Sequence, residues 1–352
     1  MRSLQIFSLA LACVLNQFAT PASAETPVRI VTFNAEILTA PGIRAGNLEK
    51  YRWDIARRAQ FERVASIIEV LNPDILNLVE VTSKEGVDLL IEILHEKGLT
   101  DLHGYHVENN DSYTGMDVAL ITRFEPVEVD GARIRTLNSE ENDPTWRQAF
   151  PAVSRKGNKY QATTSISRNA VYLMDIDGHK LGFLGLHLKS NPSDEYANAK
   201  RSAQAEIAKR VVQQEIVSRG YTPIILGDIN DYDPDVPDRD ETRDTATTVL
   251  SDLKDFDPSK PGSELFNVAK LMPRQADRFT SLWDRNENGV MDPFDVMTMI
   301  DHILLPQAFE PYVKRAFIFH SIDLTTTDHL AVVVDLLLPR KVAVPATAAV
   351  TQ

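Results

Sequence analysis

Short runs of β-branched and other apolar residues alternate with stretches of helical spacing along nearly the whole chain. The first run, 28–33, is followed by apolar residues at helical positions up to Leu71, and a second run begins at Asp74. Asn72 and Pro73 stand between the two, as expected where a helix gives way to extended structure. This alternation is typical of an α/β protein.

The pattern continues to the C-terminal part of the chain. Asp177 and Gly178 form a hairpin turn signal between two apolar runs, which predicts that these two strands are antiparallel. Gly98 and Gly220 follow two segments of helical spacing and mark their expected ends. Further strands are predicted at 117–122, 171–176, 181–186, 224–226, 303–305 and 330–338, and helices at 87–97 and 195–219.

The first 24 residues have the features of an export signal. A basic start at Arg2 precedes a mostly apolar stretch over 4–15, and the small residues at 22–24 suit a cleavage site. We therefore expect a mature protein that begins near Glu25 and is periplasmic or secreted. The apolar stretch is shorter than the about 20 residues that cross a membrane, so no transmembrane segment is predicted. Lipoprotein anchoring at Cys13 is an alternative.

Composition excludes several kinds of chemistry. Cys13 is the only cysteine, so a chain cut before Glu25 has no thiol nucleophile, thiolate zinc site or disulfide. The formal net charge is −13, which argues against a simple polyanion-binding surface, so a metal ion must supply positive charge. Residues 231–257 contain ten acidic residues against three basic ones, a net of −7, and are expected to form a solvated surface loop.

Polar side chains suited to hydrolysis lie at the ends of six predicted strands. Four positions follow their apolar runs and two precede theirs: Asn34, Glu80, His187 and Asp228 follow, and Asp301 and the pair Asp328 and His329 precede. If the last two strands run opposite to the first four, all six positions meet at one edge, which is where a site belongs.

Six ordered blocks carry a more specific resemblance. They are Thr-Phe-Asn at 32–34, Leu-Val-Glu-Val at 78–81, Gly-Leu-His-Leu-Lys-Ser at 185–190, Leu-Gly-Asp-Ile-Asn-Asp at 226–231, Met-Ile-Asp-His-Ile-Leu at 299–304 and Thr-Asp-His-Leu-Ala-Val at 327–332. In this order they resemble the endonuclease/exonuclease/phosphatase superfamily. A seventh block, 166–168, is similar to the segment in which deoxyribonuclease I-like members place a phosphate-binding arginine.

The resemblance implies a four-layer α/β/β/α sandwich, with two mixed β-sheets packed face to face and helices on both outer sides. Residues 25–338 would form this one domain. The signal segment 1–24 would precede it, and a flexible tail at 339–352 would follow it.

The resemblance also implies a metal site and a phosphate site. The expected ligands of a Mg²⁺ or Mn²⁺ ion are Glu80, Asp328, Asn34 and Asp228, because hard cations prefer oxygen ligands. The expected contacts to the substrate phosphate come from Arg168, Asn34 and Asn230; the guanidinium fork suits phosphate geometry.

Proton transfer would fall to the two histidines. His187 and His329 have the residue type that exchanges protons near neutral pH, and the pattern does not say which one is the base. Asp301 would orient His329 and raise its basicity. Asp228 and Asn230 would position the nucleophile or a second metal.

We therefore expect an exported metal-dependent phosphoesterase whose substrate is a phosphate ester. Export and the block around Arg168 favour a nuclease acting on DNA or RNA. The alternatives are a phosphomonoesterase or phospholipid- or sphingomyelin-type phosphodiesterase of the same superfamily, and a non-catalytic calcium-binding relative.

A second metal hypothesis concerns residues 284–295. Oxygen donors at alternate positions around Gly289 resemble an EF-hand or dockerin calcium loop; they are Asp284, Asn286, Asn288, Asp292 and Asp295. Asp295 replaces the usual glutamate, and the five residues before Asp301 leave no room for a full exiting helix. Ca²⁺ binding and an ordinary Asn/Gly turn both stay open.

Overall fold

The computed structural model describes residues 25–44, 46–47, 54–138, 144–154, 156–241, 247–286, 288–322 and 325–340. The expected signal segment 1–24, with Cys13, and residues 341–352 of the expected tail lie outside the described residues. Within the described ranges, none of the helices has the length and apolar character needed to cross a membrane.

One large sheet has six strands and is mixed. Its order from edge to edge is β14 (Val313–Phe319), β15 (Ala331–Pro339), β1 (Glu25–Leu38), β2 (Ile75–Val81), β4 (Asp117–Thr122) and β3 (His103–Tyr105). β1 and β2 are parallel, and the other neighbours are antiparallel.

The second large sheet has five strands. Its order is β10 (Leu265–Asn267), β13 (Asp301–Pro306), β9 (Thr222–Asp228), β8 (His179–His187) and β7 (Asn169–Ile176). β8 and β9 are parallel, and the other pairs are antiparallel. The hairpin expected at Asp177 and Gly178 joins β7 to β8.

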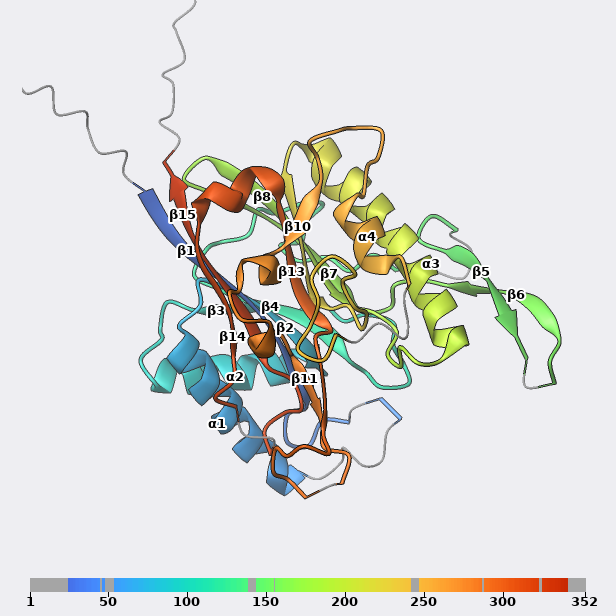
Figure 1. The fold of residues 1–352 in the computed structure, drawn as a ribbon. Coiled ribbons are helices and arrows are strands. Elements are labelled where there is room, and N and C mark those ends of the chain that lie inside the picture. Colours follow the sequence, from blue (N-terminus) through green and yellow to red (C-terminus); the bar gives the residue numbers. More distant parts are fainter. Residues whose placement is uncertain are drawn as a thin grey trace, which may run out of the picture.

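The two sheets pack face to face and helices cover their outer sides, which confirms the predicted four-layer sandwich. Side chains alternate between layers, as the strand period of two requires: Ile30 packs between the sheets, whereas Val31 packs under the helices. α1 (Asp54–Leu71) and α2 (Lys84–Glu96) lie on the six-stranded sheet; α3 (Glu195–Val211) and α4 (Val249–Lys254) lie on the other (Figure 1).

Several elements differ from the sequence prediction. The helix expected at 195–219 is α-helical only to Val211; a π-helical turn (Val212–Ile216) and a 3-10 turn (Val217–Arg219) complete it, and Gly220 ends it at φ 80°. Two small two-stranded sheets were not predicted: β5 (Gln148–Val153) with β6 (Lys159–Thr164), and β11 (Ser281–Trp283) with β12 (Val296–Thr298). Short 3-10 turns occupy Val268–Leu271, Gln275–Asp277 and Gln307–Tyr312.

The expectation that 231–257 forms a solvated surface loop is wrong for much of its described part. Asp231, Asp233 and Asp238 are buried, and the apolar residues of α4 enter the core around α3. Asp231 Oδ2 accepts a 2.8 Å hydrogen bond from Arg201 Nε, and both side chains are at most 1% exposed. Asp233 pairs with Lys254 at 2.6 Å. Charge density alone missed this because the partner Arg201 lies 30 residues away in the sequence.

Candidate active site

Strand register brings three of the expected site residues side by side. His187, the last residue of β8, lies opposite Asp228 at the end of parallel β9, and Asp301, the first residue of antiparallel β13, lies on the other side of Asp228. Asp228 faces the same side of its strand as Leu226, which packs between the sheets, and Asp301 faces the same side as Ile303. Their side chains therefore enter the space between the sheets at its edge.

The six-stranded sheet contributes Asn34 and Glu80 from its two parallel strands. A β-bulge displaces Glu80 from the ladder on both sides and gives it a left-handed φ of 65°, which re-aims its side chain. Asn34 Nδ2 donates to Glu80 Oε1 and to Asp228 Oδ2, each at 3.1 Å. One buried amide thus ties the two sheets together at the site.

Glu80, His187 and Asp228 form a first group whose ligating atoms all lie within 4.8 Å of one another. His187 Nε2 is 3.7 Å from Glu80 Oε1 and 3.6 Å from Asp228 Oδ2. Burial raises the pKa of Glu80, and burial together with the charge of Asp301 raises the pKa of Asp228 well above its ordinary value. Two buried carboxylates with oxygens this close together are a donor set that fits a divalent cation.

Asp228, Asp301 and His329 form a second group. His329 Nδ1 is 2.8 Å from Asp301 Oδ2, and its Nε2 faces Asp228 Oδ2 at 3.9 Å. Burial opposes the charged imidazolium, but the negative charge and hydrogen bond of Asp301 outweigh it and raise the pKa of His329 well above its ordinary value. Asp301 Oδ1 is buried and receives no hydrogen bond from the described part of the chain.

Thr280 joins the segments that carry Asp301 and His329. Its hydroxyl accepts hydrogen bonds from the backbone N–H groups of Ile300 and Asp301, and its carbonyl accepts one from Leu330 at 2.7 Å. The segments that carry Asp301 and His329 are therefore held by the same buried residue.

Arg168 lies against His187. Its Nη1 is 3.2 Å from Nε2 of His187, and the backbone N–H of His187 donates to the Arg168 carbonyl at 3.1 Å. Asp111 Oδ2 accepts a 2.6 Å hydrogen bond from Arg168 Nε and so holds the guanidinium in place. Burial and then the positive charge of Arg168 lower the pKa of His187 well below its ordinary value. The pKa values of His187 and His329 are thus shifted in opposite directions.

The remaining expected residues lie at the margin of these groups. The Asp328 side chain is 51% exposed, its Oδ1 is 3.7 Å from His329 Nε2, and it belongs to neither of these two groups. Asn230 is buried with a left-handed φ of 55°, and its Nδ2 donates to the Leu188 carbonyl at 3.3 Å.

Sequence reasoning missed Glu36 and Asp111. Burial, followed by the charges of Asp328 and Glu80, raises the pKa of Glu36 to about 7, so Glu36 is a further acid at this edge. An acidic residue two positions after Asn34 was a signal that could have found it. No local pattern indicated Asp111, because its partner Arg168 is 57 residues away.

The loop at 284–295 is the connection between β11 and β12, so strands flank it instead of the two helices of an EF-hand. Its polar groups bond to one another: Asp284 Oδ2 accepts from the Gly289 N–H at 2.6 Å, and Asp292 Oδ2 accepts from Asn286 and Asn288 at 2.8 Å each. Asp295 Oδ2 accepts from the Asp292 N–H. This is the hydrogen bonding of a self-contained turn, and a calcium role stays a hypothesis.

The fold and the two groups of ligating side chains define a metal-dependent phosphoester hydrolase. The chain belongs to the endonuclease/exonuclease/phosphatase family, whose model matches residues 32–329. The predicted family and enzyme class are therefore confirmed. A search for curated relatives by sequence finds no match.

Solved structures share the fold at low sequence identity. An AP endonuclease from Archaeoglobus fulgidus has a TM-score of 0.54 at 14% identity, covering 87% of this chain and 98% of its own. A 3' phosphatase, NExo, from Neisseria, bound to product DNA hairpin, has a TM-score of 0.51 at 14% identity, covering 88% and 99%. Truncated TDP2 from Caenorhabditis elegans has a TM-score of 0.51 at 17% identity, covering 88% and 98%.

Proposed function

We propose that the protein is an exported nuclease that hydrolyses phosphodiester bonds of DNA or RNA with Mg²⁺ or Mn²⁺. The observation that carries this proposal is the local charge beside His187. The acidic segment that follows Asp228 turns inward at Asp231 and Asp233, where Arg201 and Lys254 neutralise it. A polyanion therefore meets fewer negative charges than the net charge of −13 suggests.

Three cations stand next to the site instead. Arg168 lies against His187, and the pKa of Lys189 is lowered by burial and then by the positive charges of Lys200 and Arg168. Burial and then Arg168 also lower the pKa of Lys200. Arg168, Lys189 and Lys200 therefore feel one another's charge, and we call them the positive patch; Asp111 and Asp194 offset part of it. Positive charge beside the site suits a phosphate chain.

The two histidines divide the proton transfers in this proposal. His187, which its surroundings keep neutral, accepts the proton of the attacking water. His329, which Asp301 keeps protonated, donates at the leaving oxygen. Arg168 and Asn230 hold nonbridging oxygens of the phosphate. A cation held by Glu80 and Asp228, with Asn34 and Asp328 beside them, would neutralise negative charge that develops on the phosphate oxygens.

Two solved structures of the same fold support a DNA substrate because each contains bound DNA. The Neisseria 3' phosphatase is bound to product DNA hairpin, and a Danio rerio TDP2 structure of the same fold is complexed with single-strand DNA product. These ligands belong to those proteins, and they make nucleic acid the first substrate to test here.

A substrate panel tests the proposal. Purified protein is incubated with Mg²⁺ or Mn²⁺ and, separately, with plasmid DNA, RNA and a simple phosphomonoester, each with and without EDTA. We expect metal-dependent cleavage of at least one nucleic acid. Inertness toward both nucleic acids together with turnover of the phosphomonoester would reject the nuclease assignment and leave the phosphatase alternative.

One observation favours a second candidate, a phospholipid-type phosphodiesterase. Large apolar side chains are exposed on the β11–β12 hairpin, among them Trp283 at 60% and Phe294 at 71%. A patch of this kind is common where proteins meet membranes. Adding phospholipid and sphingomyelin vesicles to the panel separates this activity from nucleic-acid cleavage.

Export is also part of the proposal. Strand β1 is described from Glu25, the residue at which the expected mature chain begins. Fractionation of the producing cells, with N-terminal sequencing of the recovered protein, should give periplasmic or secreted material that starts near Glu25. A blocked, lipid-modified Cys13 would support anchoring instead, and an intact Met1 in the cytoplasmic fraction would refute export.

A further inference from the structure

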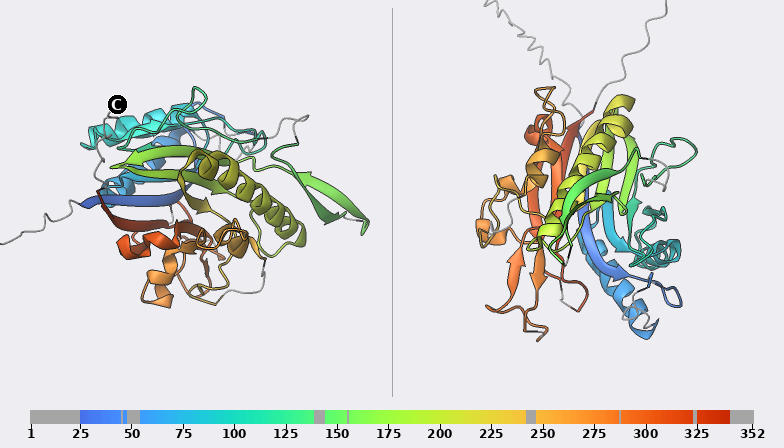
Figure 2. Two further views of the ribbon diagram at one scale, coloured as in Figure 1. Left: turned by 90° about the horizontal axis from the view of Figure 1, so that it is seen from above. Right: turned by 90° about the vertical axis from the view of Figure 1, so that its right-hand side faces the viewer.

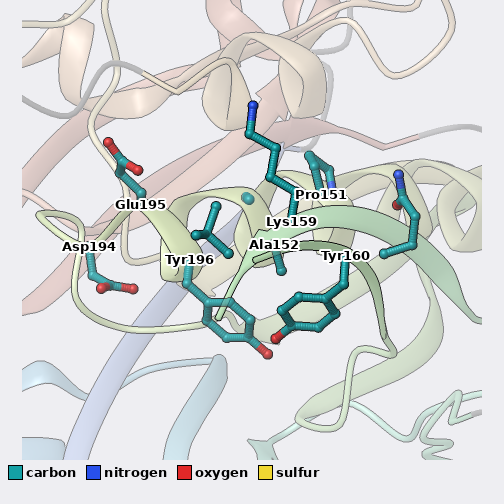
Figure 3. A pocket seen from close by; sticks show the side chains of 10 residues that line it. Pro151, Ala152, Lys159, Tyr160, Asp194, Glu195 and Tyr196 are labelled. Atoms are coloured by element: carbon teal, nitrogen blue, oxygen red, sulfur yellow. The ribbon is translucent and has the colours of Figure 1, made fainter. Parts of the chain in front are cut away.

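A pocket of about 740 Å³ lies between the β5–β6 hairpin and the start of α3. The hairpin projects from the body of the molecule on the side of α3 (Figures 1 and 2). Tyr160 from β6 and Tyr196 from the first turn of α3 line the pocket, and Figure 3 shows their phenol rings turned toward one another. Tyr160 and Tyr196 are 47% and 40% exposed and stand among the exposed large apolar residues of the structure.

The aromatic surface is held in place from below. The Tyr196 ring packs edge-on against Phe150 of β5, with centroids 5.4 Å apart and planes at 65°. Phe150 is itself buried in a small cluster with Ala152 and Ala203, which joins the hairpin to α3. Asp194 caps the helix by accepting a 2.7 Å hydrogen bond from the Ala197 N–H. The two walls of the pocket are therefore attached to each other.

Short connections link both walls to the active site. Strand β6 ends at Thr164, four residues before Arg168, a reach of at most about 15 Å. The other wall begins at Asp194, seven residues after His187. Gln204 on α3 ties the two connections together, since Nε2 donates to the Ser165 carbonyl and Oε1 accepts from the Lys189 N–H.

Two lysines of the positive patch lie close to the pocket along the chain. Lys189 lies in the connection from His187 to α3, and Lys200 lies one turn beyond the pocket residue Tyr196. Arg168 influences both lysines electrostatically. Proteins bind a single strand with cations near exposed aromatic rings, because the cations bind the phosphates and the rings stack on the bases.

We propose that this pocket is a base-stacking subsite for a nucleotide that flanks the cleaved phosphodiester in a single-stranded nucleic acid. The proposal rests on the nuclease function proposed above and assigns part of its substrate recognition to Tyr160 and Tyr196. Stacking does not distinguish strongly among bases, because every base has an aromatic face. The subsite therefore favours a nucleobase at one position without fixing which base it is.

Abasic scanning tests the subsite. Single-stranded oligonucleotides carry one tetrahydrofuran residue at successive positions on both sides of the cleaved bond, and KM and kcat are measured for each. For the wild type, removal of the base at one position should raise KM at least about fivefold with little change in kcat, the scale of one base–aromatic stack. Elsewhere in the oligonucleotide the abasic residue should have little effect.

Variants of Tyr160 and Tyr196 test whether their rings cause the change in KM. The Tyr160→Ala, Tyr196→Ala double variant should show the raised KM on the complete oligonucleotide and no further loss on the abasic one. Matched Tyr160→Phe and Tyr196→Phe variants keep the ring and should behave as the wild type. Tyr160→Ala alone guards against misfolding, because this ring is half exposed, and melting temperature checks all variants.

The outcomes separate the two proposals. If the wild type cleaves oligonucleotides but the alanine variants keep both its KM and its response to the abasic residue, the subsite is refuted and the nuclease function stands. If the wild type cleaves no oligonucleotide at all, the nuclease function fails and this inference fails with it. Lys200→Gln should raise KM equally for complete and abasic substrates, as loss of a phosphate contact would.

Discussion

Replacing Asp231 with alanine would leave the guanidinium of Arg201 buried without its carboxylate. Both side chains are essentially inaccessible, and the guanidinium also donates to the Lys189 carbonyl at 2.8 Å and to Asn198 Oδ1 at 2.6 Å, so it cannot turn to water. Breaking a buried pair on one side costs about 3–5 kcal/mol, because the remaining charge loses its compensation. In a domain of this size, that corresponds to a fall in melting temperature of roughly 5–10 °C.

Chemical denaturation measures the effect directly. The chain has three tryptophans, so their fluorescence reports unfolding in guanidinium chloride, and the midpoint should fall for Asp231→Ala without a change in slope. The matched control is Asp235→Ala, which removes another acid of the same segment. Asp235 pairs with Lys254 but is 74% exposed, so its loss should cost less than about 1 kcal/mol.

Equal stability of the two variants would refute the reasoning. It would mean that the buried pair of Asp231 with Arg201 contributes no more to stability than the exposed carboxylate of Asp235. The double variant Arg201→Met, Asp231→Leu gives a second check. It removes both charges at once and should recover much of the lost stability, because the desolvation cost disappears with them.

Three further predictions concern the site and the loop. His187→Ala and His329→Ala should each lower kcat by at least about 100-fold in the substrate panel while the fold stays intact, and unchanged turnover in both would leave the proton-transfer roles without support. His329→Ala should also lower the melting temperature, because it leaves the buried carboxylate of Asp301 without its partner. EDTA should abolish activity, and added Mn²⁺ should raise the melting temperature of the wild type but not of Glu80→Gln; an identical rise would place the ion elsewhere. If the 284–295 loop holds Ca²⁺, added Ca²⁺ should raise the melting temperature; no rise favours the plain turn.

The edge that carries the site could be predicted because its signals are local. An apolar run that ends in Asn34 or His187 marks a strand end, whatever the rest of the chain does. The positions of these residues relative to one another depend on register. The sequence contains no marker for the pairing that puts His187 and Asp301 on either side of Asp228. His302 illustrates the difference: it is adjacent to Asp301 but faces the other way, toward Asn267.

Two features were not predicted from the sequence: the burial of Asp231 and the β5–β6 hairpin. Burial of Asp231 follows from Arg201 on α3, which no segment of 231–257 can indicate. The β5–β6 hairpin contains a proline, Pro151, which normally argues against a strand. Proline is tolerated there because both strands of a two-stranded sheet are edge strands.

The pairing of β1 with β15 also fixes where the folded chain can be attached to something else. Glu25 lies opposite Pro339, at the far end of the same two strands whose other ends carry Asn34 and His329. Nine residues of extended chain put that end roughly 30 Å from the chemistry. A support surface, a fusion partner or a short peptide that joins Arg340 to Glu25 in a circular permutant would therefore leave the approach to the metal-ligating edge unobstructed for a long substrate.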